Sequence, residues 1–447
     1  MVVPDSILIK NGVILDSQGS RKADLLVRAG IIAQIARGIT PEGILNSDNQ
    51  ENGIPAPDSD LKVVNAHGCI ITPALADVHV HFREPGNPEK ETIRTGSMAA
   101  AAGGFTAVCT MPNLNPAPDS PENIAIEQKL IDEGACIDVL PYATITKGRK
   151  GLEPVDVQAL KDLAVAFSDD GSGVQDEAAM EEAMRLIAAN DCILAAHCED
   201  NSLLNGGYIH QGSYAGIHGH KGICSRSEWG QIERDLKLAA KTGCRYHVCH
   251  ISTKESVELI RRAKKRGVKV TCETAPHYLD LIDRDIEEDG RFKMNPPIRG
   301  EQDRLALIQG IKDGTIDIIA TDHAPHTAEQ KSKGLQESAF GVVGLETAFP
   351  VLYTRLVGRG IISAQKLIEL MSDNPRRLFG LHSAVLEEGQ TAELAVFDTA
   401  NRYFVNPDEF LSKGHATPFD GWAVRGRCAL TMHDGRIVYA RDEYLRQ

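Results

Sequence analysis

The chain has 447 residues, which is long for one ordinary domain and suits a barrel of about 250 residues or more with an appended smaller domain. Its hydrophobic content of 42% and charged content of 25% are those of a globular protein. The net charge of −14 argues against nucleic acid as a partner, because a phosphate-binding surface needs an excess of Lys and Arg. A small anionic substrate remains compatible with this charge, since one buried Arg can hold a carboxylate.

The ten cysteines are scattered and form no Cys-x-x-Cys pair. The first residues lack the basic and apolar regions of a signal peptide, and no apolar run reaches membrane-spanning length. We therefore expect a cytoplasmic protein with reduced thiols and no membrane contact. Cys198 and Cys249 each stand beside a histidine, but neighbours on a strand point to opposite faces, so both thiols are expected to point away.

Both ends of the chain show short apolar runs separated by tight turns. Asn11-Gly12 near the start and Asp434-Gly435 near the end are hairpin signals. A polar, Pro- and Asp-rich segment from about residue 40 to residue 60 predicts a surface loop. Together the two ends, residues 1–72 and 385–447, predict a small β-sandwich with a structural role.

The middle of the chain, residues 73–384, alternates strand-like and helix-like segments. We count eight apolar runs, near residues 78–81, 106–111, 137–143, 164–168, 193–197, 246–250, 268–274 and 316–321. Helix start signals separate several of them, for example Asp119-Ser-Pro-Glu122. Eightfold strand–helix alternation predicts an α/β fold, specifically a (β/α)8 TIM barrel.

Functional side chains of such a barrel project from the C-terminal ends of its strands. The first run ends with His79 and His81, whose alternate spacing puts both imidazoles on one face of a strand. The later runs end in further ligand-type residues, which are Asp169 and Asp170, His197, His250 and Asp322. With only one of the adjacent Asp169 and Asp170 counted, six unpartnered polar groups at one barrel mouth would be costly to bury, so the pattern predicts a metal site.

Four histidines and two aspartates exceed the needs of one tetrahedral ion and indicate two. Two close cations need an anionic bridge, and only one of the adjacent Asp169 and Asp170 can face them. A hydroxide completes the bridge and is nucleophilic at neutral pH. Asp322 is the expected general base, taking a proton from the nucleophile and returning it to a leaving nitrogen. His247, three residues before His250, is expected to be structural.

Several motifs together resemble the bacterial class I dihydroorotases, and the resemblance covers nearly the whole chain. The motifs are Asp77-Val-His-Val-His-Phe-Arg-Glu-Pro-Gly86, Thr110-Met-Pro-Asn113, Ser168-Asp-Asp-Gly171, Ala196-His-Cys-Glu199, His247-Val-Cys-His-Ile-Ser-Thr253, Lys293-Met-Asn-Pro-Pro297, Ala320-Thr-Asp-His-Ala-Pro-His326, Ser412-Lys-Gly414 and Thr417-Pro-Phe-Asp-Gly-Trp422. This resemblance implies a zinc-dependent hydrolase that interconverts N-carbamoyl-L-aspartate and L-dihydroorotate in pyrimidine biosynthesis.

The same resemblance assigns roles to individual residues. It implies one zinc among His79, His81, Asp170 and Asp322 and a second among Asp170, His197 and His250, with Asp170 as the bridge. No carboxylated lysine is expected, because the fourth run ends in Ser168-Asp-Asp without a lysine. The substrate contacts that it implies are His81, Arg83, Asn113, Asn295, His326, Phe340 and Gly341. A guanidinium at position 83 also suits a carboxylate on chemical grounds.

Two alternatives stay open at the level of sequence. Hydantoinases, dihydropyrimidinases and allantoinases share the barrel and metal pair, but their rings lack the carboxylate that Arg83 and Asn113 would hold. A catalytically inactive scaffold for aspartate transcarbamoylase is disfavoured, because all six ligand-type residues are present. A homodimer and an association with aspartate transcarbamoylase are further expectations.

The polar loop 327–341 is expected to act as a lid. It reads Ser338-Ala-Phe-Gly341 where the family pattern has Ala-Pro-Phe-Gly. Loss of a proline adds freedom to the chain, so a less ordered loop is expected.

Overall fold

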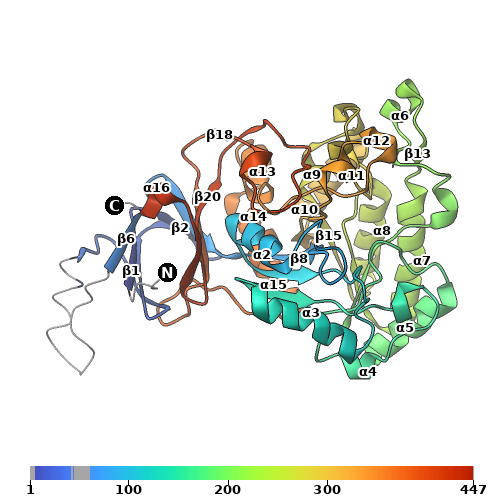
Figure 1. Ribbon diagram of the computed structural model, residues 1–447, viewed down its shortest axis with the longest axis horizontal. Coiled ribbons are helices and arrows are strands. Elements are labelled where there is room, and N and C mark those ends of the chain that lie inside the picture. The colour runs from blue at the N-terminus through green and yellow to red at the C-terminus, as the bar shows by residue number, and fades with distance from the viewer. Residues whose placement is uncertain (1–5, 42–43, 45–60, 446–447) are drawn as a thin grey trace.

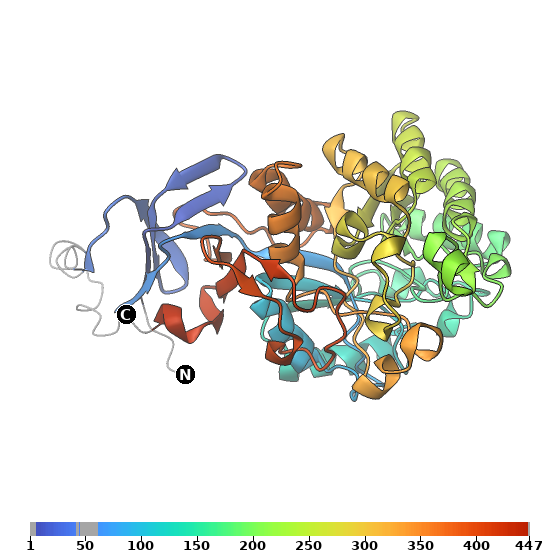
Figure 2. The ribbon, with the colours of Figure 1, turned by 90° about the horizontal axis from the view of Figure 1, so that it is seen from above.

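The computed structural model describes residues 6–41, 44 and 61–445 of the chain. Two β-sheets built from both ends of the chain lie at one end of the molecule, and an α/β barrel built from its middle lies at the other (Figures 1 and 2). Most of the predicted surface loop at residues 40–60 falls outside the described residues. Of the described helices, none is both long enough and apolar enough to cross a bilayer.

The first sheet of the sandwich has four strands in the order β5-β4-β1-β6, and the second has six in the order β21-β20-β17-β7-β2-β3. Their bounds are β1 (Ser6–Lys10), β2 (Val13–Asp16), β3 (Gly19–Lys22), β4 (Asp24–Arg28), β5 (Ile31–Ala36), β6 (Leu61–Asn65), β7 (Cys69–Pro73), β17 (Leu394–Asp398), β20 (Arg427–His433) and β21 (Arg436–Ala440). The six-stranded sheet pairs β7 with β17, so strands of the two chain ends are direct neighbours. The predicted sandwich from both ends is confirmed.

The core between these two sheets is apolar. Ile14, Leu25, Ile71, Val396 and Leu430 are fully buried and belong to one hydrophobic cluster. These side chains come from both sheets, and burial of each large aliphatic group contributes about 1.5–3 kcal/mol. The sandwich is therefore held by ordinary hydrophobic packing between its layers.

The barrel closes through parallel pairing of successive strands. Its strands are β8 (Leu75–Val80), β9 (Phe105–Thr110), β10 (Asp138–Pro141), β11 (Ile193–Ala196), β14 (Arg245–Val248), β15 (Val270–Thr274) and β16 (Ile318–Ile319). The fourth predicted run is not a regular strand, because only Phe167 bridges Ala143 on one side and Leu194 on the other. A parallel bridge between Val80 and His323 closes the ring. The predicted (β/α)8 barrel is confirmed.

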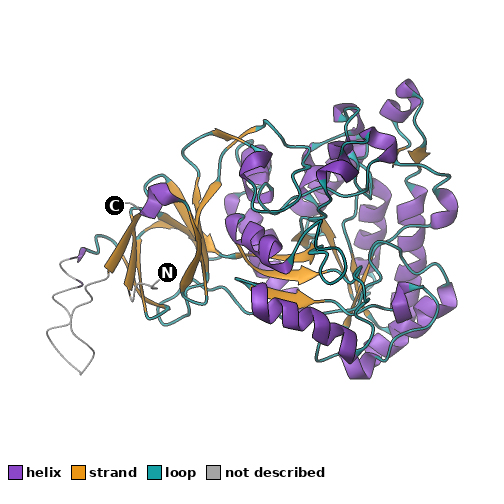
Figure 3. Ribbon diagram, viewed as in Figure 1, coloured by secondary structure: helices purple, strands orange, loops and turns teal. Residues whose placement is uncertain are grey.

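Helices surround the strands of the barrel (Figure 3). They are α2 (Ile93–Ala102), α3 (Pro121–Gly134), α4 (Val157–Leu160), α5 (Glu177–Ala189), α7 (Arg226–Thr242), α8 (Lys254–Lys265), α10 (Glu301–Lys312), α13 (Ala348–Leu352), α14 (Ala364–Ile368) and α15 (Asn374–Phe379). The predicted start of α3 is observed, since the Ser120 side chain accepts from Asn123 N and Pro121 is the first helical residue. A short helix, α16 (Asp442–Leu445), ends the described chain.

Several short elements complete the described chain. They are β12 (Ile209–His210), α6 (Ser213–His218), β13 (Gly222–Ile223), α9 (Pro276–Asp280), α11 (Ala328–Lys331), α12 (Gly334–Glu337), β18 (Tyr403–Phe404) and β19 (Ala423–Val424). The segment from β18 to β19 leaves the sandwich and contacts the barrel, where the Ser412 hydroxyl donates to Glu91 at 2.5 Å. The domain boundaries at 72/73 and 384/385 remain a prediction, and this segment contacts the barrel although it lies beyond residue 385.

Candidate metal centre

The six predicted metal ligands meet at the C-terminal ends of the barrel strands. His79 lies within β8, whereas the other five follow strand ends or the Phe167 bridge; all six side chains are buried. His250 and Asp322 have positive φ values of 34° and 50°, which turn the backbone sharply after β14 and β16. Such conformations are rare for residues other than glycine and concentrate at functional sites.

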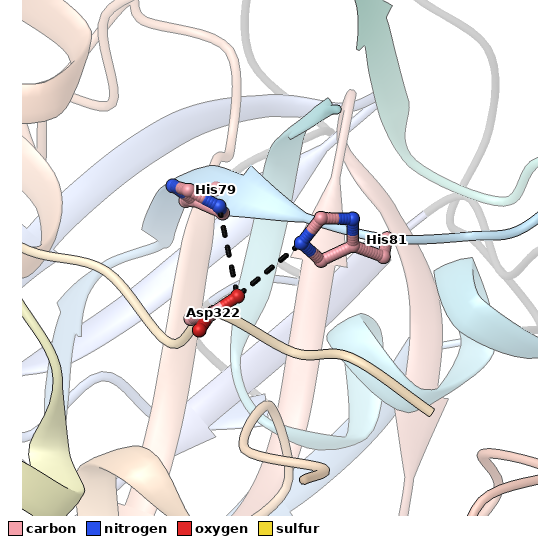
Figure 4. Close-up of side chains that lie close together, drawn as sticks. All are labelled: His79, His81 and Asp322. Atoms are coloured by element: carbon pink, nitrogen blue, oxygen red, sulfur yellow. Dashed lines mark hydrogen bonds and ion pairs between the residues drawn. The ribbon is translucent and has the colours of Figure 1, made fainter. Parts of the chain in front are cut away.

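The first group of side chains joins the first and last strands of the barrel. His79 Nε2 and His81 Nε2 both face Asp322 Oδ1, at 3.6 and 3.2 Å (Figure 4). Asp170 Oδ2 lies 3.5 Å from His81 Nε2. The second ring nitrogen of His81, Nδ1, donates to Asn113 Oδ1 at 2.8 Å, which directs Nε2 toward the cluster.

The second group surrounds the other oxygen of Asp170. Asp170 Oδ1 lies 3.4 Å from both His79 Nε2 and His250 Nε2, and 3.5 Å from His197 Nδ1. Burial alone would raise the pKa of Asp170, but these three histidines hold it well below its usual range. The two oxygens of one carboxylate thus face two different sets of ring nitrogens.

The geometry of these groups fits divalent cations. His79 Nε2 is buried without a hydrogen-bond partner, and the facing nitrogens of His197 and His250 lie only 3.0 Å apart. Atoms bound to one zinc at about 2.0–2.1 Å lie roughly 3.3–3.4 Å from each other in a tetrahedron. The contacts of 3.4–3.6 Å are long for hydrogen bonds and close to this spacing.

Asp169 and Asp170 are separated by their surroundings. The Asp169 carboxylate accepts from the backbone N–H groups of Ile145 and Thr146, at 2.8 and 3.1 Å, and from the Thr146 hydroxyl. These bonds tie the Asp169 side chain to the loop after β10, whereas the Asp170 side chain faces the histidines. Sequence spacing alone left this choice open.

Glu273 is a functional residue that sequence reasoning missed. This fully buried carboxylate in β15 accepts hydrogen bonds from His79 Nδ1 at 2.7 Å and from His247 Nε2 at 3.0 Å. It therefore orients the ring of His79 through Nδ1, so that Nε2 faces the cluster, as carboxylates commonly do for metal-binding histidines. His247 faces Glu273 and not the cluster. The one available signal was a charged residue inside a predicted barrel strand.

The two cysteines beside histidines differ in outcome. Cys198 Sγ points to the Tyr246 hydroxyl at 3.1 Å, as expected of a residue turned away from the cluster. Cys249 Sγ instead lies in a buried group with His79 and Glu273. Regular alternation fails there because β14 ends at Val248 and the backbone turns at His250.

Arg83, His326 and Phe340 lie together at the rim of the cluster. Arg83 Nε donates to Pro325 O at 3.3 Å, and Arg83 Nη2 lies 3.5 Å from His326 Nε2. Burial lowers the pKa of Arg83 to about 10, so the guanidinium stays charged at neutral pH. His326 Nε2 donates to the Phe340 carbonyl at 2.7 Å, and burial beside Arg83 lowers the pKa of His326 to about 3.

The other predicted substrate residues flank the cluster at different points. Asn113 binds His81 through its oxygen, so its amide nitrogen stays a donor. Asn295 Nδ2 donates to Glu199 Oε1 at 2.9 Å, on the side of His197. Gly341 has φ 129°, and a Cβ there would lie 2.6 Å from Ala324 O, so only glycine fits.

Arg149 is a second residue at the mouth that the sequence did not single out. Its Nη1 donates to the Asp170 main-chain oxygen at 2.6 Å, and its backbone has φ 56°. It steadies the peptide that presents the Asp170 carboxylate. No motif or strand position marks Arg149, because it lies in the loop after β10.

Hydrogen bonds hold the loop 327–341 together, although it lacks the proline of the family pattern. Ala339 N, a donor that proline lacks, donates to Gln330 O at 3.0 Å. Ser338 Oγ donates to Lys331 O at 3.0 Å and accepts from Lys333 N at 3.1 Å. The resting order of the loop stays a prediction, while the Ser338 hydroxyl and the Ala339 N–H form hydrogen bonds that Ala and Pro of the family pattern would not supply.

The barrel, the terminal sandwich and the histidine–carboxylate mouth define a cyclic-amide hydrolase of the amidohydrolase type. Among solved structures the chain is similar to the L-hydantoinase (dihydropyrimidinase) of Arthrobacter aurescens, with TM-score 0.83 and 26% identity over 99% of this chain and 97% of that one. Residues 68–256 match the "Dihydro-orotase-like" family model. Dihydroorotases of Bacillus cytotoxicus and Bacillus cereus are each 47% identical over 441 residues, covering 98% of this chain and 99% of each relative. The chain belongs to the dihydroorotase family.

Proposed function

We propose that this chain interconverts N-carbamoyl-L-aspartate and L-dihydroorotate in pyrimidine biosynthesis and holds two zinc ions at the barrel mouth. The observation that carries the proposal is a full-length match to dihydroorotases joined to a charged Arg83 beside the histidine–carboxylate cluster. The ring of dihydroorotate differs from hydantoin in bearing a carboxylate, and a buried guanidinium provides for that group.

His79, His81, Asp170 and Asp322 would hold one ion, and Asp170, His197 and His250 the other. When bound, such cations polarise the scissile carbonyl and lower the pKa of a water molecule. Asp170 is suited to bridging because its Oδ2 faces His81 of the first group, whereas its Oδ1 faces His197 and His250 of the second group as well as His79. Glu273 and Asn113 orient His79 and His81 through their second ring nitrogens.

Asp322 carries the proton. Burial raises the pKa of this carboxyl, but the hydrogen bond from His81 and the nearby histidines lower it below its usual value, so it is ionised at neutral pH. In ring opening it accepts a proton from the attacking water and returns it to the leaving ring nitrogen. In ring closure it takes the proton from the carbamoyl nitrogen and delivers it to the departing oxygen, which gains a second proton from solvent and leaves as water.

Arg83, Asn113 and His326 hold the carboxylate of the substrate. Arg83 supplies the charge, and Asn113 supplies an amide donor through its nitrogen. His326 is neutral at pH 7, and its Nε2 proton is shared with the Phe340 carbonyl. The backbone of Phe340 and Gly341 would contact the ring of the substrate, together with Asn295, whose Nδ2 donates to Glu199 Oε1.

The test is ring opening of L-dihydroorotate, hydantoin and dihydrouracil by one purified sample whose metal content is also measured. We expect close to two zinc ions per chain and a clear preference for dihydroorotate. Equal rates on hydantoin and dihydroorotate would contradict the substrate assignment. A chain without activity and without metal would instead match a scaffold protein. A homodimer and association with aspartate transcarbamoylase remain predictions, as does the cytoplasmic location that the cysteine pattern favours.

A further inference from the structure

Lys331 is a buried lysine within the loop 327–341, and none of the described carboxylates forms an ion pair with it. The Lys331 side chain is 6% exposed, and in the described part of the chain no carboxylate lies within ion-pair distance of it. Its Nζ instead donates to three backbone carbonyls, those of Lys293, Ala339 and Gly341, at 3.0, 2.8 and 2.7 Å. Burying an ammonium without a counter-ion costs free energy, and the three hydrogen bonds offset part of that cost.

The three acceptors define what Lys331 holds. Ala339 and Gly341 stand on either side of Phe340, and Lys293 is two residues before Asn295. The Gly341 N–H also donates to Lys293 O at 3.1 Å. Three carbonyl oxygens match the three N–H groups of an ammonium, whereas a neutral amine offers only two. Burial and the nearby Lys293 lower the pKa of Lys331 to about 7, although the more distant Asp289 acts in the opposite direction.

Neighbouring contacts support the same arrangement. The Lys293 side chain is also buried, donates to Gln336 O at 2.7 Å and lies 4.5 Å from the centre of the Phe340 ring. A Cβ at Gly290 would lie 2.2 Å from Lys331 O, so the loop seats directly on the backbone there. The loop is therefore closed by contacts with the 290–293 segment.

We propose that Lys331 is a positioning residue, whose ammonium clamps the backbone on both sides of Phe340 and so presents Phe340 and His326 to the substrate. The effect passes through the Phe340 carbonyl, which accepts from His326 Nε2, and His326 in turn lies beside Arg83. The inference rests on the proposed function for its substrate. Lys331 touches neither the six predicted metal ligands nor the reacting atoms.

The test compares Lys331→Met with Lys333→Met, the same substitution at an exposed lysine two residues away. The Nζ of Lys333 lies 3.4 Å from Glu329 and makes no other polar contact among the described residues. A loop that must become ordered during binding weakens binding more than chemistry, so Lys331→Met should raise KM for dihydroorotate about tenfold and change kcat less than about threefold. Lys333→Met should match the wild type. Metal content should be unchanged in both.

Amide hydrogen exchange makes the test independent of the substrate. Exchange at Ala339 and Gly341 should become faster in Lys331→Met and stay unchanged in Lys333→Met, even if the wild type fails to open dihydroorotate and the proposed function is wrong. Unchanged KM and unchanged exchange would overturn the clamp, and so would loss of metal.

A second variant guards against a general loss of folding. Lys331→Arg keeps the positive charge but changes the arrangement of donors, so we expect the same effects in smaller size. If neither variant folds, Lys331 is a general element of stability and the proposal of a loop clamp is wrong.

Discussion

The barrel mouth and the sandwich core are equally buried but differ completely in chemistry. The sandwich core consists of side chains such as Ile71, Val396 and Leu430, whose burial stabilises the fold without further partners. The mouth buries histidines and carboxylates, and His79 Nε2 has no hydrogen-bond partner. Apolar layers therefore hold the molecule together, whereas the mouth bears a desolvation cost that a bound cation would offset. Substitutions in the two regions should separate catalysis from stability.

The largest effect on catalysis is expected at Asp170. Asp170→Asn removes the charge that faces both sets of ring nitrogens, so ring-opening activity should fall by about a thousandfold or more, with fewer than two ions per chain. The neighbouring Asp169→Asn is the matched control. It should lower the melting temperature yet keep both ions, because Asp169 binds backbone amides in the loop. If Asp169→Asn lost activity and metal while Asp170→Asn kept both, Asp169 would be the bridging residue.

Arg83→Ala should come next. Loss of the guanidinium leaves the substrate carboxylate without its charged partner, so kcat/KM on dihydroorotate should fall about a hundredfold while metal content stays the same. Arg94→Ala, at an exposed position on α2, serves as the control and should be silent. Full activity of the Arg83 variant would break the link between this residue and substrate choice.

Glu273→Gln should have a smaller effect on the same centre. The amide is a weaker acceptor for His79 Nδ1 and His247 Nε2, so metal affinity should drop by about 10- to 100-fold. Competition with a chelator measures this affinity. The exposed substitution Glu122→Gln should leave it unchanged, and an unaltered affinity in Glu273→Gln would mean that the carboxylate does not tune the histidine.

The smallest effect on catalysis is expected in the sandwich. Leu430→Ala creates a cavity in an apolar core and should lower the free energy of unfolding by about 2–5 kcal/mol, with kcat/KM of the folded protein unchanged. Phe404→Ala, whose side chain is 71% exposed, should change stability far less. A loss of activity in folded Leu430→Ala would show that the two regions are coupled.

The regular parts of the molecule were readable from the sequence. Apolar alternation and turn signals predicted both ends of the sandwich, and eight strand-like runs predicted the barrel. The His79-x-His81 pattern also predicted two rings on one strand face, because side chains alternate strictly within a strand. The prediction failed at Cys249, where the strand had already ended.

Local sequence determined which residues could stand at the ends of the barrel strands, because strand alternation and turn chemistry are short-range properties. Only the tertiary structure decided which of them face one another. Asp169 and Asp170 are neighbours with the same side chain, and contacts with Ile145 and Thr146 separate them. Glu273 meets His79 from 194 residues away, and Lys331 finds its acceptors at Lys293 and Gly341. Such pairings depend on how the barrel closes, a long-range geometry that no local period in the sequence records.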